Sequence, residues 1–345
     1  MCFGCRRHHA AFAFLLVLTT VCSGSERPRR SAADKPRTSP PRAGVRTPGI
    51  QIPFTSLQAE AQIPLNGPVA GLALGKEVFA AVEANSALAK LDLKTNKFDE
   101  LKLEGLKPCA PPVSAFDGIW IADCSSGKLL KLDAKVPKTA GSIDVMALPG
   151  AGTVTAGPDS VWLLSDSRTI LSRVDPEKYA VVAETRLPPQ CSSVAYGEGA
   201  LWVTCPSENQ VLRINTLTNV VEQRIKVEGA PSVVTTGSGS VWVLTKEEGK
   251  VVRIDPKTHK PVATTELKAP AKQATMAFGE GALWVSLPDF PLSRIDPGTD
   301  AVVQQFGGEG SGLVMAGNGS VWLVASGSNV VRRYDPKRIR ATFAE

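Results

Sequence analysis

Residues 232–267 read SVVTTGSGSVWVLTKEEGKVVRIDPKTHKPVATTEL, and this stretch decides the fold. Two apolar runs flank the turn Gly237-Ser238-Gly239, which predicts a β-hairpin. A third apolar run ends at Asp255-Pro256, because Asp and Pro favour the first two positions of a type I turn. Residues 261–267 form a fourth run. Since no helical period interrupts the segment, we expect four short antiparallel strands.

The same unit recurs seven times along the chain. One aromatic residue marks each copy, and neighbouring copies are 38 to 42 residues apart. These aromatic residues are Phe79, Trp120, Trp162, Trp202, Trp242, Trp284 and Trp322. Further along each copy, a base precedes an acid or amide by two positions: Lys90/Asp92, Lys131/Asp133, Arg173/Asp175, Arg213/Asn215, Arg253/Asp255, Arg294/Asp296 and Arg333/Asp335. Repeats of this kind predict an all-β fold, a seven-bladed β-propeller of four-stranded antiparallel blades.

The regular residues of the repeat have structural interpretations. We expect the aromatic side chains to fill the gaps between blades, and the bases to stack on a Trp or to pair with a carboxylate. The last unit retains only residues 338–345 for its fourth strand, and two Arg residues make that strand a poor one. Residues 60–65 resemble the fourth strands of other units. We therefore expect this N-terminal strand to complete the last blade and close the ring.

The first 57 residues differ in composition from the repeats. A basic segment followed by twelve mostly apolar residues, 10–21, predicts a secretory signal peptide over residues 1–23. Lipid attachment at Cys22 is an alternative that the preceding Thr19-Thr20-Val21 disfavours. Residues 24–57 are rich in Pro, Arg, Ser and Thr and predict a disordered basic linker. The propeller is then expected over residues 58–345, exported to the periplasm or out of the cell.

The charge of the chain lies in that N-terminal segment. Residues 1–50 hold nine of the 39 Lys and Arg residues and two of the 33 Asp and Glu residues, so 30 bases and 31 acids remain for the rest. A nearly neutral repeat region has no basic surface for DNA or RNA. The basic linker could add a weak attraction to an anionic envelope, or it could be a plain spacer.

Four cysteines follow the leader, two in the second unit and two in the fourth. Cys109 and Cys124, like Cys191 and Cys205, fall at the start of a first strand and the end of a second. Opposed residues of a hairpin lie within disulfide range, so we predict two bridges within blades, Cys109–Cys124 and Cys191–Cys205. A zinc site is the alternative, but no His or CxxC motif accompanies these residues.

The motif Gly239-Ser240-Val241-Trp242-Val243, followed by Arg253-Ile254-Asp255-Pro256, resembles the repeats of the YVTN and virginiamycin B lyase-like (streptogramin lyase) superfamily. The resemblance covers roughly residues 58–345 and implies a propeller. It also implies a metal-assisted lyase that uses His and acidic side chains on one face of the ring. Here His259 is the one His beyond the leader, and it falls in a turn on the opposite face. The catalytic pattern of the family is therefore missing, and we predict no catalytic residues, no metal site and no cofactor.

Candidate site residues are those that differ between copies. Acidic residues at the ends of four second strands predict a loose acidic arc on the ligand face, which could hold a cation or a polyol or could simply be solvated. The apolar loop around Phe290 could be a contact site or could pack against the adjacent blade. The ligand-face candidates are Glu83, Asp123, Asp166, Glu247, Gln273 and Phe290.

The sequence predicts an exported, monomeric, non-enzymatic propeller that binds an unknown protein or small ligand on its disulfide-braced face. One alternative is a divergent virginiamycin B lyase-like or lactonase-like enzyme. Another is a scaffold that the basic linker displays in the envelope. No transmembrane span is expected.

Overall fold

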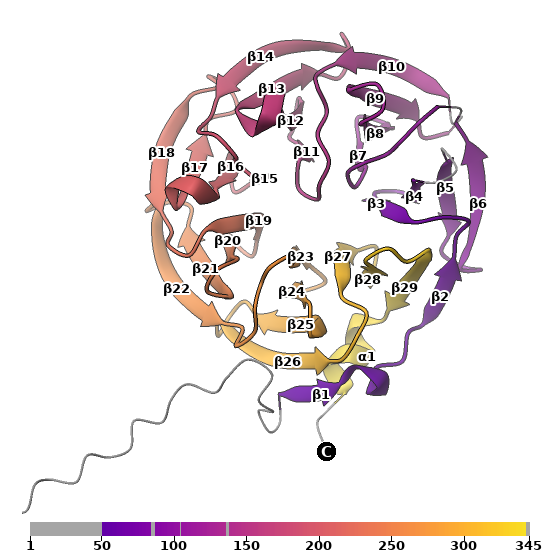
Figure 1. Ribbon diagram of the computed structural model, residues 1–345, viewed down its shortest axis with the longest axis vertical. Helices are drawn as coiled ribbons and strands as arrows, with labels where there is room; N and C mark the ends of the chain where they lie inside the picture. The colour runs from indigo at the N-terminus through magenta and orange to yellow at the C-terminus, as the bar shows by residue number, and fades with distance from the viewer. Residues whose placement is uncertain (1–49, 84–86, 104, 136–137, 343–345) are drawn as a thin grey trace, which may run out of the picture. The chain divides into compact units, whose positions relative to one another are not determined.

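The computed structural model describes residues 50–83, 87–103, 105–135 and 138–342. These residues form seven β-sheets arranged as blades around a central axis (Figure 1). Consecutive strands of a blade run from the innermost strand outward and pair antiparallel. The predicted all-β, seven-bladed propeller is therefore confirmed. Within the described ranges, no helix has the length and apolar character needed to cross a bilayer.

Blades 1 to 6 each take four consecutive strands. Blades 1 and 2 consist of β3 (Val69–Leu74), β4 (Val78–Val82), β5 (Ala87–Asp92) and β6 (Lys97–Lys102), then β7 (Val113–Ala115), β8 (Gly118–Asp123), β9 (Lys128–Asp133) and β10 (Thr139–Asp144). Blades 3 and 4 consist of β11 (Val154–Ala156), β12 (Val161–Ser165), β13 (Ile170–Asp175) and β14 (Ala180–Arg186), then β15 (Ser193–Gly197), β16 (Ala200–Cys205), β17 (Gln210–Ile214) and β18 (Val221–Lys226). Blades 5 and 6 consist of β19 (Pro231–Gly237), β20 (Ser240–Thr245), β21 (Lys250–Asp255) and β22 (Lys260–Glu266), then β23 (Thr275–Gly279), β24 (Ala282–Leu287), β25 (Phe290–Asp296) and β26 (Ala301–Gly307).

Blade 7 is assembled from both ends of the described chain. Its inner strands are β27 (Gly312–Gly317), β28 (Ser320–Ala325) and β29 (Val330–Tyr334). The outer strand is β2 (Ala61–Pro64), which pairs antiparallel with β29 from Ala61 opposite Arg333 to Pro64 opposite Val330. The predicted closure by an N-terminal strand is thus confirmed, and it leaves β29 without a free edge.

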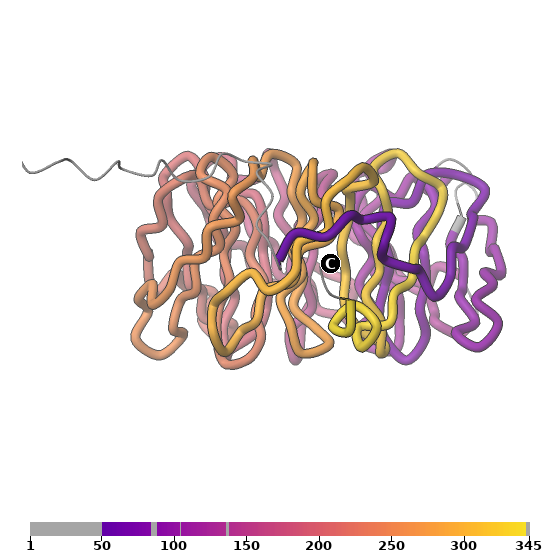
Figure 2. The backbone as a smooth tube through the Cα atoms, turned by 90° about the horizontal axis from the view of Figure 1, so that it is seen from below, coloured from indigo at the N-terminus to yellow at the C-terminus, as the bar shows by residue number. Residues whose placement is uncertain are grey.

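The predicted boundary between the linker (24–57) and the propeller (58–345) lies too far along the sequence. Strand β1 (Gln51–Pro53) pairs parallel with β26 and gives blade 6 a fifth strand. A 3-10 turn, η1 (Phe54–Ser56), follows, and Ile52 and Leu57 are buried against blades 6 and 7. Figure 2 shows this N-terminal segment running across the outside of the ring towards blade 7. Burial of these apolar side chains joins residues 51–57 to the fold, whereas the signal peptide and the rest of the linker lie outside the described residues.

The end of the chain forms a helix, α1 (Pro336–Ala341), in place of a fourth strand. The side chain of Asp335 accepts a hydrogen bond from the backbone N–H of Lys337, and Pro336 occupies the first turn. Both features favour the start of a helix. Ile339 is fully buried, and the side chain of Gln304 donates to the carbonyls of Ile339 and Thr342 at 2.6 Å each. Because β2 already pairs with β29, the end of the chain packs instead against blades 6 and 7 through Ile339 and Gln304.

The repeated aromatic residues fill the spaces between blades, as predicted. Each packs against the second strand of the following blade: Trp242, for example, contacts the cluster of Leu283 and Val285, and Trp322 closes the ring against Val78 of blade 1. All seven are at most 2% exposed. In five blades the repeated base lies 5.3 to 6.0 Å from the ring of the Trp directly opposite on the neighbouring strand of the same blade. The regular residues therefore hold the ring together.

Candidate binding face and central channel

One face of the propeller carries both disulfides, and we call it the braced face. It consists of the loops that lead into the innermost strands and the loops that join second to third strands. Its described loops include 106–112, 124–127, 145–153, 166–169, 187–192, 206–209, 227–230, 246–249 and 267–274. Backbone hydrogen bonds connect the two kinds of loop, for example from Lys246 to Ala230 and from Glu247 to Gly229.

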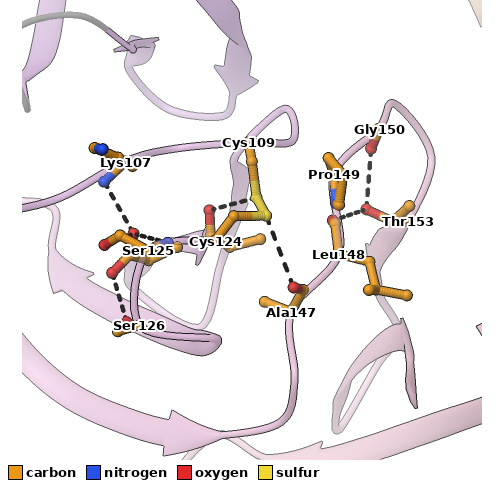
Figure 3. Close-up of a disulfide and its surroundings, with 12 residues drawn as sticks. Lys107, Cys109, Cys124, Ser125, Ser126, Ala147, Leu148, Pro149, Gly150 and Thr153 are labelled. Carbon is orange, nitrogen blue, oxygen red and sulfur yellow. Dashed lines mark hydrogen bonds between the residues drawn. A yellow bond between two sulfur atoms is a disulfide. The ribbon is translucent and has the colours of Figure 1, made fainter. Parts of the chain in front are cut away.

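The first predicted disulfide, Cys109–Cys124, is present, with a Cα–Cα distance of 5.8 Å (Figure 3). It joins the loop that leads into β7 to the end of β8, where the Cys109 N–H also donates to the Ala122 carbonyl. The Gly150 N–H donates to the Cys109 carbonyl at 2.9 Å, and the Thr153 hydroxyl donates to the Gly150 carbonyl at 3.0 Å. The bridge of blade 2 therefore also steadies the loop that leads into blade 3.

The second predicted disulfide, Cys191–Cys205, has a Cα–Cα distance of 4.0 Å, and both cysteines are fully buried. Next to it, the Ser192 hydroxyl donates to the Ser232 carbonyl at 2.8 Å. This contact links the loop that leads into blade 4 with the start of blade 5. The two disulfides and their neighbours thus brace four consecutive blades at one face.

Arg168 is a bracing residue that sequence reasoning missed. It ends the 3-10 turn η2 (Asp166–Arg168), in which all three residues have positive φ, 42°, 54° and 64°. Its guanidinium donates to the Pro149 carbonyl at 2.8 Å and to the Ser192 carbonyl at 3.1 Å. Left-handed backbone is costly for residues other than glycine, and these charge-assisted hydrogen bonds offset that cost. No motif marks Arg168, because its partners are backbone carbonyls from two distant loops.

Asp123 is buried and forms its hydrogen bonds within the loop, so it does not face the open surface. It is 4% exposed and accepts hydrogen bonds from the Lys107 N–H, the Ser125 N–H and hydroxyl, and the Ser126 hydroxyl. Burial acts to raise the pKa of Asp123, but the hydrogen bonds from Ser126, Lys107 and Ser125 outweigh it and hold the pKa below its ordinary value. The carboxylate stabilises the loop beside Cys124.

The other members of the predicted acidic arc stay apart. Glu83, Asp166 and Glu247 are exposed, each on a different blade. Among the described residues, no three His, Cys, Asp or Glu side chains converge as metal ligands would. His259 lies in the turn between β21 and β22, with φ of 58° and its N–H donating to the Asp255 carbonyl, on the face opposite the braced one.

The two remaining candidates have different environments. Phe290 is 5% exposed and lies in the core cluster between blades 5 and 6, so the packing alternative holds and the contact alternative does not. Strand β25 begins at Phe290 itself, which lies opposite Leu287 of β24. Gln273 is exposed, with φ of 61°, and lies at the mouth of the central channel.

A central channel with a volume of about 460 Å³ lies between the innermost strands of the blades. All seven blades contribute to its walls, mainly through their innermost strands, and none of its 21 lining residues is charged. Ala151 and Gln273 lie at its mouth on the braced face, and Leu74 and Phe278 lie towards the other end. The loops held by the disulfides and Arg168 therefore border one side of the mouth of this neutral cavity, at Pro111, Pro112, Ala151 and Gly152.

The family comparison matches residues 125–292 to a family described as a domain of unknown function, DUF5074. No curated protein matches the chain. Solved structures with the same fold include a streptogramin B lyase (17% identity, TM-score 0.65, covering 79% of this chain and 96% of that one). Virginiamycin B lyase from Staphylococcus aureus (15%, 0.66, 79% and 97%) and BamB from Moraxella catarrhalis (12%, 0.58, 81% and 99%) are also similar. At these identities the likeness shows the propeller fold.

Proposed function

We propose that this protein is an exported, monomeric, non-enzymatic binding module that holds a ligand or partner at the braced face. The observation that carries the proposal is the neutral channel, whose mouth is bordered by loops that two disulfides and the Arg168 contacts hold in place. Bracing keeps a binding surface preorganised, which lowers the entropy lost on binding. Gln273, at the mouth, is the sequence-predicted candidate placed best to contact a ligand.

Export is supported by the two disulfides, because such bonds persist in oxidising compartments and are rare in the cytosol. The signal-like residues 1–23 agree with this compartment. We include a weak association of the basic linker with an anionic envelope in the proposal, and we do not assign a lipid at Cys22.

Lyase chemistry is not carried over from the structural relatives. One similar structure is a histidine-to-alanine virginiamycin B lyase described as catalytically inactive, with quinupristin. This chain has one His beyond residue 49, and His259 lies on the face opposite the channel mouth. The lining of the channel offers no acid or base to move a proton.

The proposal is tested with two matched variants. Gln273→Arg places a cation at the mouth of the channel, whereas Ser238→Arg places one on an exposed turn of the opposite face with the same left-handed backbone. Wild type and both variants are immobilised, incubated with envelope extract, and the retained molecules are identified by mass spectrometry. We expect retention by wild type and Ser238→Arg, at least tenfold loss with Gln273→Arg, and recovery of the retained molecule with unchanged mass. Equal retention by all three proteins, or conversion of the retained molecule, would contradict the proposal.

A metal titration tests the enzymatic alternative separately. Calorimetry with Mg²⁺ or Ca²⁺ should show no tight stoichiometric binding, because the oxygens of Asp123 already accept four hydrogen bonds. Tight binding that is lost in Asp123→Asn would instead favour a metal-dependent site on this face.

A further inference from the structure

The walls of the channel expose apolar side chains to its interior. The partly exposed side chains come from five different blades: Leu74, Val113, Val233, Phe278, Leu313 and Met315. Exposure of apolar side chains to water is unfavourable by roughly 25 cal/mol per Å² of apolar surface. A molecule that displaced water from these walls would recover part of that free energy.

The polar atoms among the walls are largely used within the ring. The Ser193 hydroxyl accepts from the Val234 N–H at 3.3 Å, and the Thr275 hydroxyl donates to the Gly312 carbonyl at 2.6 Å and accepts from the Val314 N–H at 3.0 Å. These bonds join the innermost strands of adjacent blades. Among the lining side chains, the remaining polar groups are Thr235 and, at the mouth, Gln273.

The absence of charge from the 21 lining residues restricts the ligand further. An ion transferred into such a site would lose its hydration without gaining a counter-charge, which is strongly unfavourable. A cavity of about 460 Å³ falls within the range of roughly 300–1,000 Å³ found for small-molecule sites.

We propose that the central channel binds a neutral, predominantly apolar small molecule that enters from the braced face with one hydrogen-bonding group at Gln273. An alcohol, an ester or an amide with a hydrocarbon body has this chemistry. The inference rests on the proposed binding function and narrows it to a class of ligand and a site.

The methionines provide reporters within the wild-type protein. Met276 and Met315 line the channel, whereas Met146 is 62% exposed on a loop outside it. The full chain with ¹³C-labelled methionine methyl groups is titrated with the neutral fluorophore N-phenyl-1-naphthylamine, and separately with 1-decanol and decanoate. We expect saturable shifts of the Met276 and Met315 methyl signals with the fluorophore and with decanol, an unmoved Met146 signal, and at least tenfold weaker binding of decanoate.

A matched pair of variants confirms the location. Met315→Gln adds polarity to the channel at nearly constant volume, and Met146→Gln makes the same change on the surface. The affinity for the fluorophore, measured from its fluorescence, should fall at least tenfold with Met315→Gln and stay unchanged with Met146→Gln. The inference is overturned if the channel methionine signals do not move, if the Met146 signal moves as much as those of Met276 and Met315, or if decanoate binds as well as decanol. The methyl titration uses the wild-type protein. It therefore still tests the inference if the Met315→Gln protein does not fold. If these results fail while Gln273→Arg still abolishes retention from the extract, the binding function stands and the ligand class is wrong.

Discussion

At the scale of single residues, the repeat places each aromatic side chain beside a base and between two sheets. The sequence was sufficient to predict this role, because a large aromatic side chain that recurs in a strand of every copy fits the space between adjacent blades of a propeller. It was not sufficient to predict which surface carboxylates gain partners. Asp123 looked like a ligand-face residue, yet its partners are two serines and a backbone N–H brought together by the folded loop.

Trp242→Ala should lower the free energy of unfolding by about 3–5 kcal/mol. The side chain is 1% exposed, and its indole N–H donates to the Gly237 carbonyl at 3.0 Å, so its removal leaves a cavity and an unpaired acceptor. Urea unfolding of variant and wild type measures the difference. Val262→Ala, in the same blade but 50% exposed, is the control and should cost much less. A Trp242→Ala protein within 1 kcal/mol of wild type would show that the inter-blade packing is unimportant.

The turn aspartates should make stability fall in acid. Hydrogen bonds from the Lys257 and Thr258 N–H groups hold the pKa of Asp255 below its ordinary value, and the same turn geometry lowers the pKa of Asp92, Asp175 and Asp296. A carboxyl with a lowered folded-state pKa stabilises above its unfolded pKa of about 3.9, and that stability is lost as the pH falls through the folded value.

We therefore expect the free energy of unfolding to decrease below about pH 4, and less steeply in Asp255→Asn. Asn215 shows that an amide oxygen suits this turn, since it accepts from the Leu217 and Thr218 N–H groups in blade 4. Unfolding at a series of pH values compares the two proteins. Parallel pH profiles would mean that the Asp255 carboxylate contributes nothing.

At the scale of elements, the strands and hairpins follow from local patterns, whereas the added elements do not. Strand β1 escaped prediction because its pairing with β26 joins residues more than 250 positions apart. Helix α1 was not predicted. Arg338 and Arg340 marked residues 338–345 as a poor fourth strand, but the helix start at Asp335-Pro336 was not recognised. The left-handed turn η2 depends on tertiary hydrogen bonds of Arg168 and has no signature in sequence.

Removal of either disulfide should destabilise the braced face. The bridged residues are 15 and 14 positions apart, and loops of this size correspond to about 3 kcal/mol each. Cys191→Ala combined with Cys205→Ala should therefore lower the free energy of unfolding by about that amount. A reductant should destabilise wild type more than this double variant, which retains one bridge. Four free thiols in the mass spectrum of the isolated protein would contradict both the bridges and the proposed compartment.

The N-terminal strands should differ in importance. A chain that begins at residue 58 loses β1, the fifth strand of blade 6, and should fold with reduced stability. A chain that begins at residue 66 also loses β2, exposes the edge of β29, and should aggregate or fail to fold cooperatively. Circular dichroism and size-exclusion chromatography compare both with a chain that begins at residue 50. Cooperative folding of the shortest chain would show that closure by β2 is dispensable.

At the scale of the whole molecule, the seven copies have similar residues at the positions that pack between blades and different residues at the positions that line the channel. The Trp positions are uniform, but the lining of the channel varies from Leu74 to Ser193 to Phe278. Sequence reasoning assigned Gln273 to the same face as the disulfides from its loop position, and the structure has it beside the channel. It could not identify the neutral channel, because its walls form only when inner strands from seven distant segments are brought together.

Native mass spectrometry of the full chain, isolated from the cells that produce it, tests the central claim most directly. The account predicts a one-to-one complex with a neutral small molecule that is released with its mass unchanged and is absent from Gln273→Arg. Protein that carries no such molecule even after incubation with an organic extract of the envelope, or that releases it chemically altered, would contradict the account.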